Sequence, residues 1–312
     1  MEIDIKGKKI GVLMGGPSSE REISLKSGKA VYEALKGAGV NVIAVDIVTD
    51  SRSENIELLK KHSFDAVFLA LHGKFGEDGG IQSILEEIKL SYTGSGAEAS
   101  ALAMDKIASR KIFQKHGLKV ARNVVARKGE WSGLNLAVRA LGLPLVIKPA
   151  NNGSSIGLTI IDKEADLDNA MRLAFSFDEH ALIEEYLPGR EMTVGILGDT
   201  ALPVIEIIPK HKYFDYEAKY GAGLTDYIVP AKIDAALSRK IQDAGLSAHR
   251  LLGCWGCSRV DIILKDATPF VLEVNTIPGF TSTSLLPKAA KVAGLEFADL
   301  CLKLLKLANE KK

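Results

Sequence analysis

The chain has 312 residues, more than one ordinary hydrophobic core accommodates, so we expect two or three domains. Its hydrophobic content of 46% and charged content of 25% are typical of globular proteins. The net charge of +1 provides no electrostatic basis for binding nucleic acid or an acidic membrane surface, and no apolar run approaches the roughly 20 residues that span a bilayer.

The N-terminal third alternates strand and helix patterns. Strands are predicted at 8–14, 41–46 and 64–71, and helices at 19–36 and 80–88. Ser19 and Glu22 have the spacing of a capping box, which would open the first helix. This alternation indicates a parallel α/β sheet that binds ligands at the carboxyl ends of its strands. His72 follows the third strand and is a pocket candidate by position, although a lone loop histidine is more often simply solvated.

The middle of the chain is predicted to begin after a boundary at 91–96. A helix is expected at 97–116, and strands at 120–126, 145–148, 158–161 and 181–187. Lys148 precedes the loop 151–157 (NNGSSIG), whose small residues can fold backbone N–H groups over phosphates. A plain hairpin turn is the alternative, but seven residues are long for one and favour a mobile lid. The last of these strands ends at Pro188 and suits contacts with an adenine base.

The C-terminal part is predicted to contain strands at 192–196 and 201–208, and an amphipathic helix at 234–252. The segment 210–225 between them is rich in Tyr, Lys, Asp and Glu and fits neither a helix nor a strand. Long irregular loops in compact domains are usually functional or disordered, and the aromatic residues here argue against disorder. We therefore expect a functional loop.

The segment 258–279 (SRVDIILKDATPFVLEVNTIPG) holds two alternating runs around a polar break, which is typical of a β-hairpin. A turn centred on Ala267 pairs 263 with 271, 261 with 273 and 259 with 275, and places Val271, Glu273 and Asn275 on one face. Asp261 then stands opposite Glu273, and such a like-charge pair is destabilising. A cation held by two carboxylates and an amide oxygen would relieve it, with Mg²⁺ preferred. A solvated face with a chance carboxylate pair is an equally good explanation of the hairpin alone.

Three cysteines, an odd and small number, favour a reducing, cytoplasmic environment. Cys254 and Cys257 form a lone C-x-x-C motif. A zinc or redox site would need a second pair or thioredoxin-like surroundings, so we attribute this motif to packing.

Nine motifs, taken in order, resemble those of the D-alanine–D-alanine ligase family within the ATP-grasp superfamily. They are GGPSSEREISLKSG (15–28), LHGKFGEDG (71–79), YTGSG (92–96), MDK (104–106), KPANNGSSIG (148–157), LIEEYLPGREMTVG (182–195), FDYEAKY (214–220), SRVD (258–261) and LEVNTIPGFTSTSLLP (272–287). Each one alone is a modest signal, but all nine at family-like spacing are specific and cover essentially the whole chain.

The resemblance implies an α/β fold of three domains: an N-terminal parallel α/β substrate domain at 1–94, and two α+β domains at 95–187 and 188–312 that sandwich ATP. It also implies an ATP-dependent ligase for peptidoglycan precursor synthesis. The carboxylate of one D-alanine would attack the γ-phosphate of ATP, and the amine of a second D-alanine would attack the resulting acyl phosphate. Two Mg²⁺ ions, with Mn²⁺ as an alternative, and a homodimer belong to the same expectation.

By similarity, the metal ligands are Asp261, Glu273 and Asn275, and the ATP contacts are Lys106, Lys148, Glu184, Glu185, Leu187, Glu191 and Lys219. The catalytic set is Glu20, Ser154, Tyr220, Arg259, Gly279 and Ser284, and the substrate contacts are Glu20, His72, Arg259, Gly279, Ser284 and Leu285. Glu20, Ser154 and Tyr220 would form a hydrogen-bonded set that closes a lid made of 151–157 and 210–225. Arg259, with the Gly279 N–H, would meet the acyl phosphate and the oxyanion.

Glu185 departs from the family, because many relatives carry lysine there, and one adenine-side contact is therefore in question. Ligation of D-alanine to D-lactate, or another dipeptide ligase activity, is an alternative on the same fold. Tyr220 is absent from relatives that use D-lactate, so its presence favours an amine acceptor. A regulator that binds nucleotide without turnover is a third interpretation, but it would not need Arg259, Asp261 and Glu273.

Overall fold

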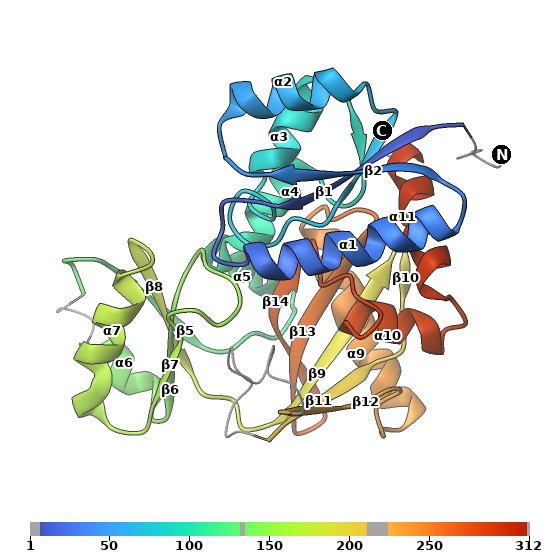
Figure 1. The fold of residues 1–312 in the computed structure, drawn as a ribbon. Coiled ribbons are helices and arrows are strands. Elements are labelled where there is room, and N and C mark those ends of the chain that lie inside the picture. The colour runs from blue at the N-terminus through green and yellow to red at the C-terminus, as the bar shows by residue number, and fades with distance from the viewer. Residues whose placement is uncertain (1–6, 132–134, 211–223, 311–312) are drawn as a thin grey trace.

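The structure is a computed structural model that describes residues 7–131, 135–210 and 224–310 (Figure 1). Its first sheet is parallel throughout, with the strand order β2-β1-β3-β4. The strands are β1 (Lys9–Gly15), β2 (Asn41–Ile47), β3 (Ala66–Leu69) and β4 (Ser91–Tyr92), and the helices between them are α1 (Arg21–Gly37), α2 (Arg52–His62) and α3 (Gly80–Glu87). The predicted parallel α/β sheet is confirmed. Helix α2 was not predicted, because it buries only Asn55 and Leu59 and has almost no apolar face.

Helix α1 begins differently from the prediction. Its N-cap is Glu20, whose side chain makes no capping hydrogen bond. The hydroxyl of Ser18 accepts the Glu20 N–H at 3.1 Å and donates to the carbonyl of His72 at 2.7 Å. The predicted capping box of Ser19 and Glu22 is therefore wrong. The carboxylate of Glu20 is left to line a cavity instead.

The second sheet is antiparallel, with the order β5-β8-β6-β7. Its strands are β5 (Asn123–Arg127), β6 (Leu145–Pro149), β7 (Thr159–Ile161) and β8 (His180–Glu185), accompanied by α6 (Asn135–Leu141), the 3-10 helix η2 (Glu164–Asp166) and α7 (Leu167–Phe175). Met171 and Ala174 of α7 pack with Ile147 and Ile183 in a separate small core.

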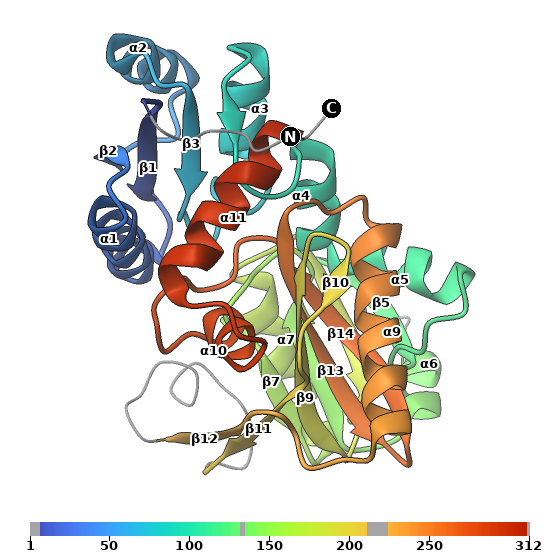
Figure 2. The same ribbon diagram turned by 90° about the vertical axis from the view of Figure 1, so that its right-hand side faces the viewer.

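The third sheet is also antiparallel, with the order β12-β11-β9-β13-β14 and β10 paired to β9. Its strands are β9 (Arg190–Leu197), β10 (Thr200–Ala201), β11 (Ile205–Pro209), β12 (Thr225–Ile228), β13 (Cys257–Lys265) and β14 (Thr268–Asn275). Helix α9 (Ala235–Leu251) covers one face of this sheet (Figure 2). Asp234 caps the helix by accepting the Leu237 N–H at 2.8 Å. One parallel and two antiparallel sheets with their helices confirm the predicted α/β class.

Two helix pairs pack on sheets that are remote in sequence. α10 (Leu285–Val292) and α11 (Phe297–Glu310) pack beside the first sheet (Figure 2). Leu300 and Leu304 of α11 lie in the core of that sheet with Phe68. α4 (Ala97–Met104) and α5 (Lys106–Lys115) instead contribute Ala103 and Phe113 to the core of the third sheet. The boundaries predicted at 94/95 and 187/188 fall between the sheets in sequence, and the three-domain division stays a prediction.

The predicted helix 97–116 is broken in two. Asp105 is extended (φ −75°, ψ 97°), and its carboxylate accepts the N–H groups of Ile107 and Ala108 at 2.9 and 3.0 Å. A side chain that caps a new helix ends the preceding one, because the residue that carries it must leave helical geometry. The break makes Lys106 the first residue of α5.

The hairpin of β13 and β14 differs from the prediction in its register. Asp261 does pair with Glu273 and Arg259 with Asn275, but a β-bulge follows, and Ile263 pairs with Phe270 instead of Val271. Asp266 and Ala267 both have left-handed φ (47° and 56°), so they form a two-residue turn. The bulge leaves Leu272 without a cross-strand partner in the β13–β14 ladder. We predicted Val271 on the same face as Glu273. Val271 instead lies in the core with Val274, whereas Glu273 lines a cavity on the other face.

Among the helices of the described residues, none is both long enough and apolar enough to cross a lipid bilayer.

Candidate active site

Two cavities meet where the three sheets converge. The first, which we call the hinge cavity, lies against the end of β8 and is lined by Lys148, Glu184, Leu187, Glu191 and Ile263 among others. The second, which we call the turn cavity, lies against the turn 276–284 and is lined by Glu20, His72, Ser154, Arg259, Gly279 and Ser284 among others. Lys106 and Glu273 line both cavities. These two side chains therefore mark the junction of the cavities.

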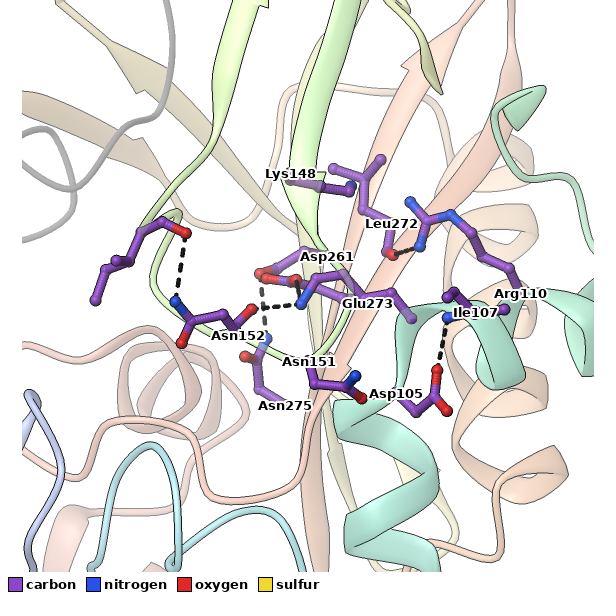
Figure 3. Close-up of polar contacts among 12 residues, drawn as sticks. Asp105, Ile107, Arg110, Lys148, Asn151, Asn152, Asp261, Leu272, Glu273 and Asn275 are labelled. Carbon is purple, nitrogen blue, oxygen red and sulfur yellow. Dashed lines mark hydrogen bonds and ion pairs between the residues drawn. The ribbon is translucent and has the colours of Figure 1, made fainter. Parts of the chain in front are cut away.

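The predicted carboxylate pair stands at this junction. Asp261 and Glu273 are direct cross-strand partners, and the Asn275 amide donates to Asp261 at 3.2 Å (Figure 3). Arg259 binds Asp261 with two hydrogen bonds of 2.9 and 2.7 Å, and the Thr193 hydroxyl donates to the same carboxylate at 2.7 Å. Glu273 lies 3.5 Å from the ammonium of Lys106. Two cations thus compensate the like-charge pair in this structure.

The oxygen donors of the hairpin fit a magnesium ion. Asp261, Glu273 and Asn275 offer two carboxylates and one amide oxygen from neighbouring positions, and hard oxygen ligands are those that Mg²⁺ prefers. Mg²⁺ usually keeps water and phosphate ligands in addition to one or two carboxylates. Within the described residues no cluster of three or more His, Cys, Asp or Glu side chains could hold a metal ion, so a metal here would need Asn275 or nonprotein ligands.

Lys106 is held by contacts that a ligand could replace. Its ammonium donates to the carbonyl of Asn152 at 2.6 Å, and its backbone N–H donates to Ala150 at 3.1 Å. The loop 151–157 therefore lies directly beside the hairpin (Figure 3). Ser154 and Ser155 of this loop have left-handed φ values of 52° and 58°, which cost free energy outside glycine.

Lys148 belongs to a buried ion-pair cluster. Its ammonium lies 2.6 Å from Glu184, and Arg110 lies 2.5 Å from the other oxygen of the same carboxylate. Burial lowers the pKa of Lys148 to about 8, while Glu184 opposes this shift. Burial alone would raise the pKa of Glu184, but Arg110 and Lys148 outweigh it and hold that pKa below its ordinary value. Glu184 therefore acts on Lys148 at neutral pH as a charged partner.

Arg110 is a site residue that the sequence interpretation missed. Besides Glu184 it binds the carbonyl of Leu272, the bulged residue, at 2.7 Å (Figure 3). It thereby ties α5, β8 and the hairpin together. Its spacing of four residues from Lys106 was the available signal, because residues i and i+4 share a helix face.

The remaining hinge residues point in different directions. Glu185 accepts the backbone N–H of Arg122 at 2.9 Å and binds its side chain at 2.8 Å, so its carboxylate is committed to that arginine. Leu187 is buried with Ala121 and Ile263. Glu185, Leu187 and Glu191 all line the hinge cavity, as the predicted ATP contacts require.

Glu20 and Ser154 face the same turn cavity. A Cβ added at Gly153 or at Gly73 would lie 3.2 Å from the Glu20 carboxylate, which shows how closely both backbones approach it. Lys219 and Tyr220 lie outside the described residues. The predicted hydrogen-bonded set of Glu20, Ser154 and Tyr220 therefore stays a prediction.

His72 holds the turn 276–280 against the first sheet. One ring nitrogen, Nδ1, lies 3.1 Å from the carbonyl of Ile277, and Nε2 lies 2.9 Å from the Ser27 hydroxyl. Burial lowers the pKa of His72 to about 4, so the ring is neutral, and Nδ1 must carry the proton because a carbonyl only accepts. Ser27 also accepts the Phe280 N–H at 3.2 Å. His72 reaches the turn cavity, and its hydrogen bonds fix the wall of that cavity.

The turn itself brings Gly279 and Ser284 together. A Cβ on Gly279 would lie 2.9 Å from the Ser284 hydroxyl, so only glycine fits without displacing that side chain. Ser284 accepts the Thr281 N–H at 3.1 Å, and Leu285, the first residue of α10, lines the same cavity.

Glu77 is a second residue that the sequence interpretation did not single out. Its carboxylate lines the turn cavity and accepts the Gly73 N–H at 2.8 Å. Burial raises the pKa of Glu77 to about 8, and the neighbouring Glu20 carboxylate adds to the rise. It stands within the motif LHGKFGEDG, where an acidic residue after a glycine-rich turn gave no distinguishing signal.

Two family models together match most of the chain. Residues 9–55 and 49–95 match the model described as D-ala D-ala ligase N-terminus, and residues 112–306 match D-ala D-ala ligase C-terminus. A D-alanine–D-alanine ligase from Geotalea uraniireducens is 46% identical over 306 residues, which cover 98% of this chain and 97% of the relative.

Solved structures agree with this result. A D-alanine–D-alanine ligase from Bacillus anthracis superimposes with a TM-score of 0.88 at 34% identity, covering 97% of this chain and 98% of the other. The structure of the same enzyme complexed with ATP has a TM-score of 0.84 at 32% identity, with the same coverage of both chains. The VanG D-Ala:D-Ser ligase from Enterococcus faecalis has a TM-score of 0.84 at 32% identity, and the match covers 97% of this chain and 100% of that one.

Proposed function

The chain belongs to the D-alanine–D-alanine ligase family, and from that premise we propose that it joins two D-alanines with ATP as co-substrate. The observation that supports this most directly is the junction of two cavities at Lys106 and Glu273. Phosphoryl transfer to an amino acid needs a nucleotide and a carboxylate to meet at one point, with cations around the transferred group. The product, D-alanyl-D-alanine, supplies peptidoglycan precursor synthesis.

The reaction divides between the cavities. In the hinge cavity, the apolar Leu187 and Ile263 suit a nucleobase, and Lys148 and Lys106 lead from it toward the junction. The carboxylate of the first D-alanine attacks the γ-phosphorus, the bond to the β-phosphate oxygen breaks, and ADP leaves. When ATP is bound, Lys106 exchanges the Asn152 carbonyl for a phosphate oxygen, which is the stronger partner for a cation.

The second step takes place in the turn cavity. The amine of the second D-alanine attacks the acyl carbon, the bond from carbon to the phosphate oxygen breaks, and phosphate leaves while the nitrogen loses a proton. Arg259 and the Gly279 N–H are our proposed donors to the oxyanion, and Glu20 is the proposed partner of the first ammonium. Arg259 would turn from Asp261 toward substrate, because its present partner is the carboxylate that we assign to the metal.

Asp261, Glu273 and Asn275 are the residues that would hold two Mg²⁺ ions, or Mn²⁺ in their place. The bound ions would neutralise charge on the transferred phosphoryl group. In this proposal, Lys219 contacts the γ-phosphate and Tyr220 belongs to the lid.

The decisive experiment is coupled ADP release with D-alanine against a panel of D- and L-amino acids, with and without Mg²⁺. D-Alanine-dependent release that requires Mg²⁺ is expected. Turnover with another amino acid but none with D-alanine would contradict the substrate assignment. D-Serine and D-lactate belong in the panel as second substrates, because the VanG D-Ala:D-Ser ligase is a structural neighbour and D-lactate is the main alternative acceptor.

Two further expectations remain proposals. A cytoplasmic location is supported by the need for ATP and by the free thiols of Cys254, Cys257 and Cys301. A homodimer is expected from the family, and light scattering during size-exclusion chromatography would test it.

A further inference from the structure

Lys288 is a cation of the turn cavity that has no role in the reaction described above. It lies on α10, one turn after Ser284, and both residues line the cavity. Residues four apart share a helix face, so α10 presents Ser284 and Lys288 to the cavity together. Leu286, Ala289 and Ala290 are buried on the opposite side. Figures 1 and 2 both show α10 beside β12, the strand that carries Tyr227.

The surroundings of Lys288 are unfavourable for a cation on its own. Its ammonium lies 4.1 Å from the centre of the Tyr227 ring, and within the described part of the chain no carboxylate is within ion-pair distance of it. Burial lowers the pKa of Lys288. It also stands in the first half of α10, where the helix dipole disfavours positive charge. The aromatic ring offsets part of this cost, and an anion in the cavity would offset the rest.

The anion that fits is a carboxylate. The turn cavity already contains the groups that we assign to the first D-alanine, Glu20 and Arg259, and Lys288 lies beyond them next to Ser284. The second D-alanine must present its amine toward Arg259 and Gly279, so its carboxylate points away from the reacting carbon. Resting on the proposed function, we propose that Lys288 binds the carboxylate of the acceptor amino acid and selects acceptors that carry a free carboxylate.

Other cavity cations do not serve this purpose equally well. Lys26 also lines the turn cavity, but its side chain is exposed to solvent, where an ion pair contributes little. Lys106 is engaged by Asn152 and Glu273 at the junction with the hinge cavity. Lys288 combines partial burial with a position beside Ser284.

The test separates the acceptor from the first D-alanine, which is chemically the same molecule. Hydroxylamine, which has no carboxylate, replaces the acceptor: its nitrogen attacks the acyl carbon, phosphate leaves, and D-alanine hydroxamate forms. The ratio of dipeptide to hydroxamate, measured at subsaturating D-alanine, therefore reports the acceptor site and cancels general losses of folding or of ATP use.

Lys288→Met removes the charge and keeps the apolar stem. We expect its dipeptide-to-hydroxamate ratio to fall about ten- to a hundredfold, the range expected for removal of a charge-assisted hydrogen bond. Lys288→Arg should restore most of the ratio. D-Alaninamide, an acceptor without the negative charge, should be used with the same efficiency by wild type and Lys288→Met.

Lys291→Met is the matched control, because Lys291 is on the same helix but is exposed and lies 3.6 Å from Glu296. It should leave the ratio unchanged. An unchanged ratio in Lys288→Met, or a fall in Lys26→Met without one in Lys288→Met, would overturn the assignment. Wild-type protein that forms neither dipeptide nor hydroxamate from D-alanine and ATP would overturn the proposed ligase function itself, and this assignment with it.

Discussion

The end of β8 and the β13–β14 hairpin are opposite walls of the hinge cavity, and they hold their charges in different ways. On β8, the buried Glu184 carboxylate forms ion pairs with Lys148 at 2.6 Å and with Arg110 at 2.5 Å. On the hairpin, Asp261 is bound by Arg259, and Glu273 lies 3.5 Å from Lys106, which also binds a loop carbonyl. The first arrangement pairs its charges within the protein, although Nη2 of Arg110 is buried without a hydrogen-bond partner among the described residues. The second uses the side chains that must turn to substrates.

This difference separates structural charge from functional charge. A buried ion pair that loses one partner leaves an uncompensated charge, so the β8 cluster should matter first for stability. The hairpin carboxylates stand at a cavity junction, and their cations can move to phosphate, so they should matter first for turnover. Substitutions at the two walls can test this division.

Glu273→Gln should abolish turnover and leave the fold intact. The amide keeps the size of the side chain but removes the charge that would hold Mg²⁺, and the loss of metal-assisted charge stabilisation corresponds to about a thousandfold or more in rate. ADP release and thermal unfolding are measured on the same preparation. Asp261→Asn should behave alike. Near-normal turnover in either variant would contradict the metal assignment, and a large loss of stability without loss of specific activity would reverse the comparison.

Glu184→Gln should destabilise the fold. It leaves Lys148 and Arg110 as buried cations without their carboxylate, which costs about 3–5 kcal/mol. The free energy of unfolding in urea is the measurement. If stability is unchanged while ATP binding is abolished, Glu184 would be a ligand contact and the β8 cluster would resemble the hairpin after all.

The pH dependence of stability tests a third buried group, His72, on the far side of the hairpin. Its folded-state pKa of about 4 lies below the ordinary value of 6.5, so the unfolded state takes up a proton first as the pH falls. Stability is therefore fully present above pH 6.5 and is lost between pH 6.5 and 4, by about 3 kcal/mol for this group.

His72→Asn should flatten this pH dependence, because the amide can still donate to the Ile277 carbonyl and cannot take up the proton. His249 has a similarly lowered pKa of about 4, caused by burial, so the difference between variant and wild type is the quantity to compare. An unchanged slope between pH 6.5 and 4 would show that His72 is accessible to protons in the folded state.

The sequence predicted the facing charges of the β13–β14 hairpin correctly but not its full register. Period-two alternation and the cross-strand rule placed Asp261 opposite Glu273, and the structure has that pair. The same rule failed at the next position of β14, Leu272, because a bulge inserts a residue there and no local sequence pattern indicates it. Arg110 binds the carbonyl of the bulged Leu272 from a position 162 residues away in the chain. Long-range contacts of this kind have no signature in a single sequence.

Helix boundaries near the site failed for a related reason. The sequence 97–116 has the composition of one helix, but Asp105 ends it and begins another, which places Lys106 at the junction of the cavities. At α1, the capping pattern of Ser19 and Glu22 is overridden, and Glu20 faces the turn cavity. In both places local preference gives way to the position of a site residue, as expected where function sets the geometry.

The smallest effect is expected one residue along β8. Glu185 pairs with Arg122 at 2.8 Å, but the arginine side chain is 61% exposed, so solvent screens the pair. Glu185→Gln should cost at most about 1 kcal/mol of stability, in contrast to Glu184→Gln, because exposed ion pairs contribute little. Urea unfolding of the two variants side by side is the measurement. Equal costs for the two variants would show that burial does not distinguish these glutamates.

Glu185→Lys, which introduces the residue expected here from the family resemblance, tests the same position for ATP binding. It would place a second cation beside Arg122, whose side chain Glu185 now binds. We expect a small loss of stability from this repulsion, again limited by solvent screening at Arg122. If the variant bound ATP more tightly than wild type, a lysine at 185 would reach the nucleotide, and the ion pair with Arg122 would occupy a position that suits ATP binding. Unchanged affinity would mean that this end of β8 contributes no side-chain charge to nucleotide binding.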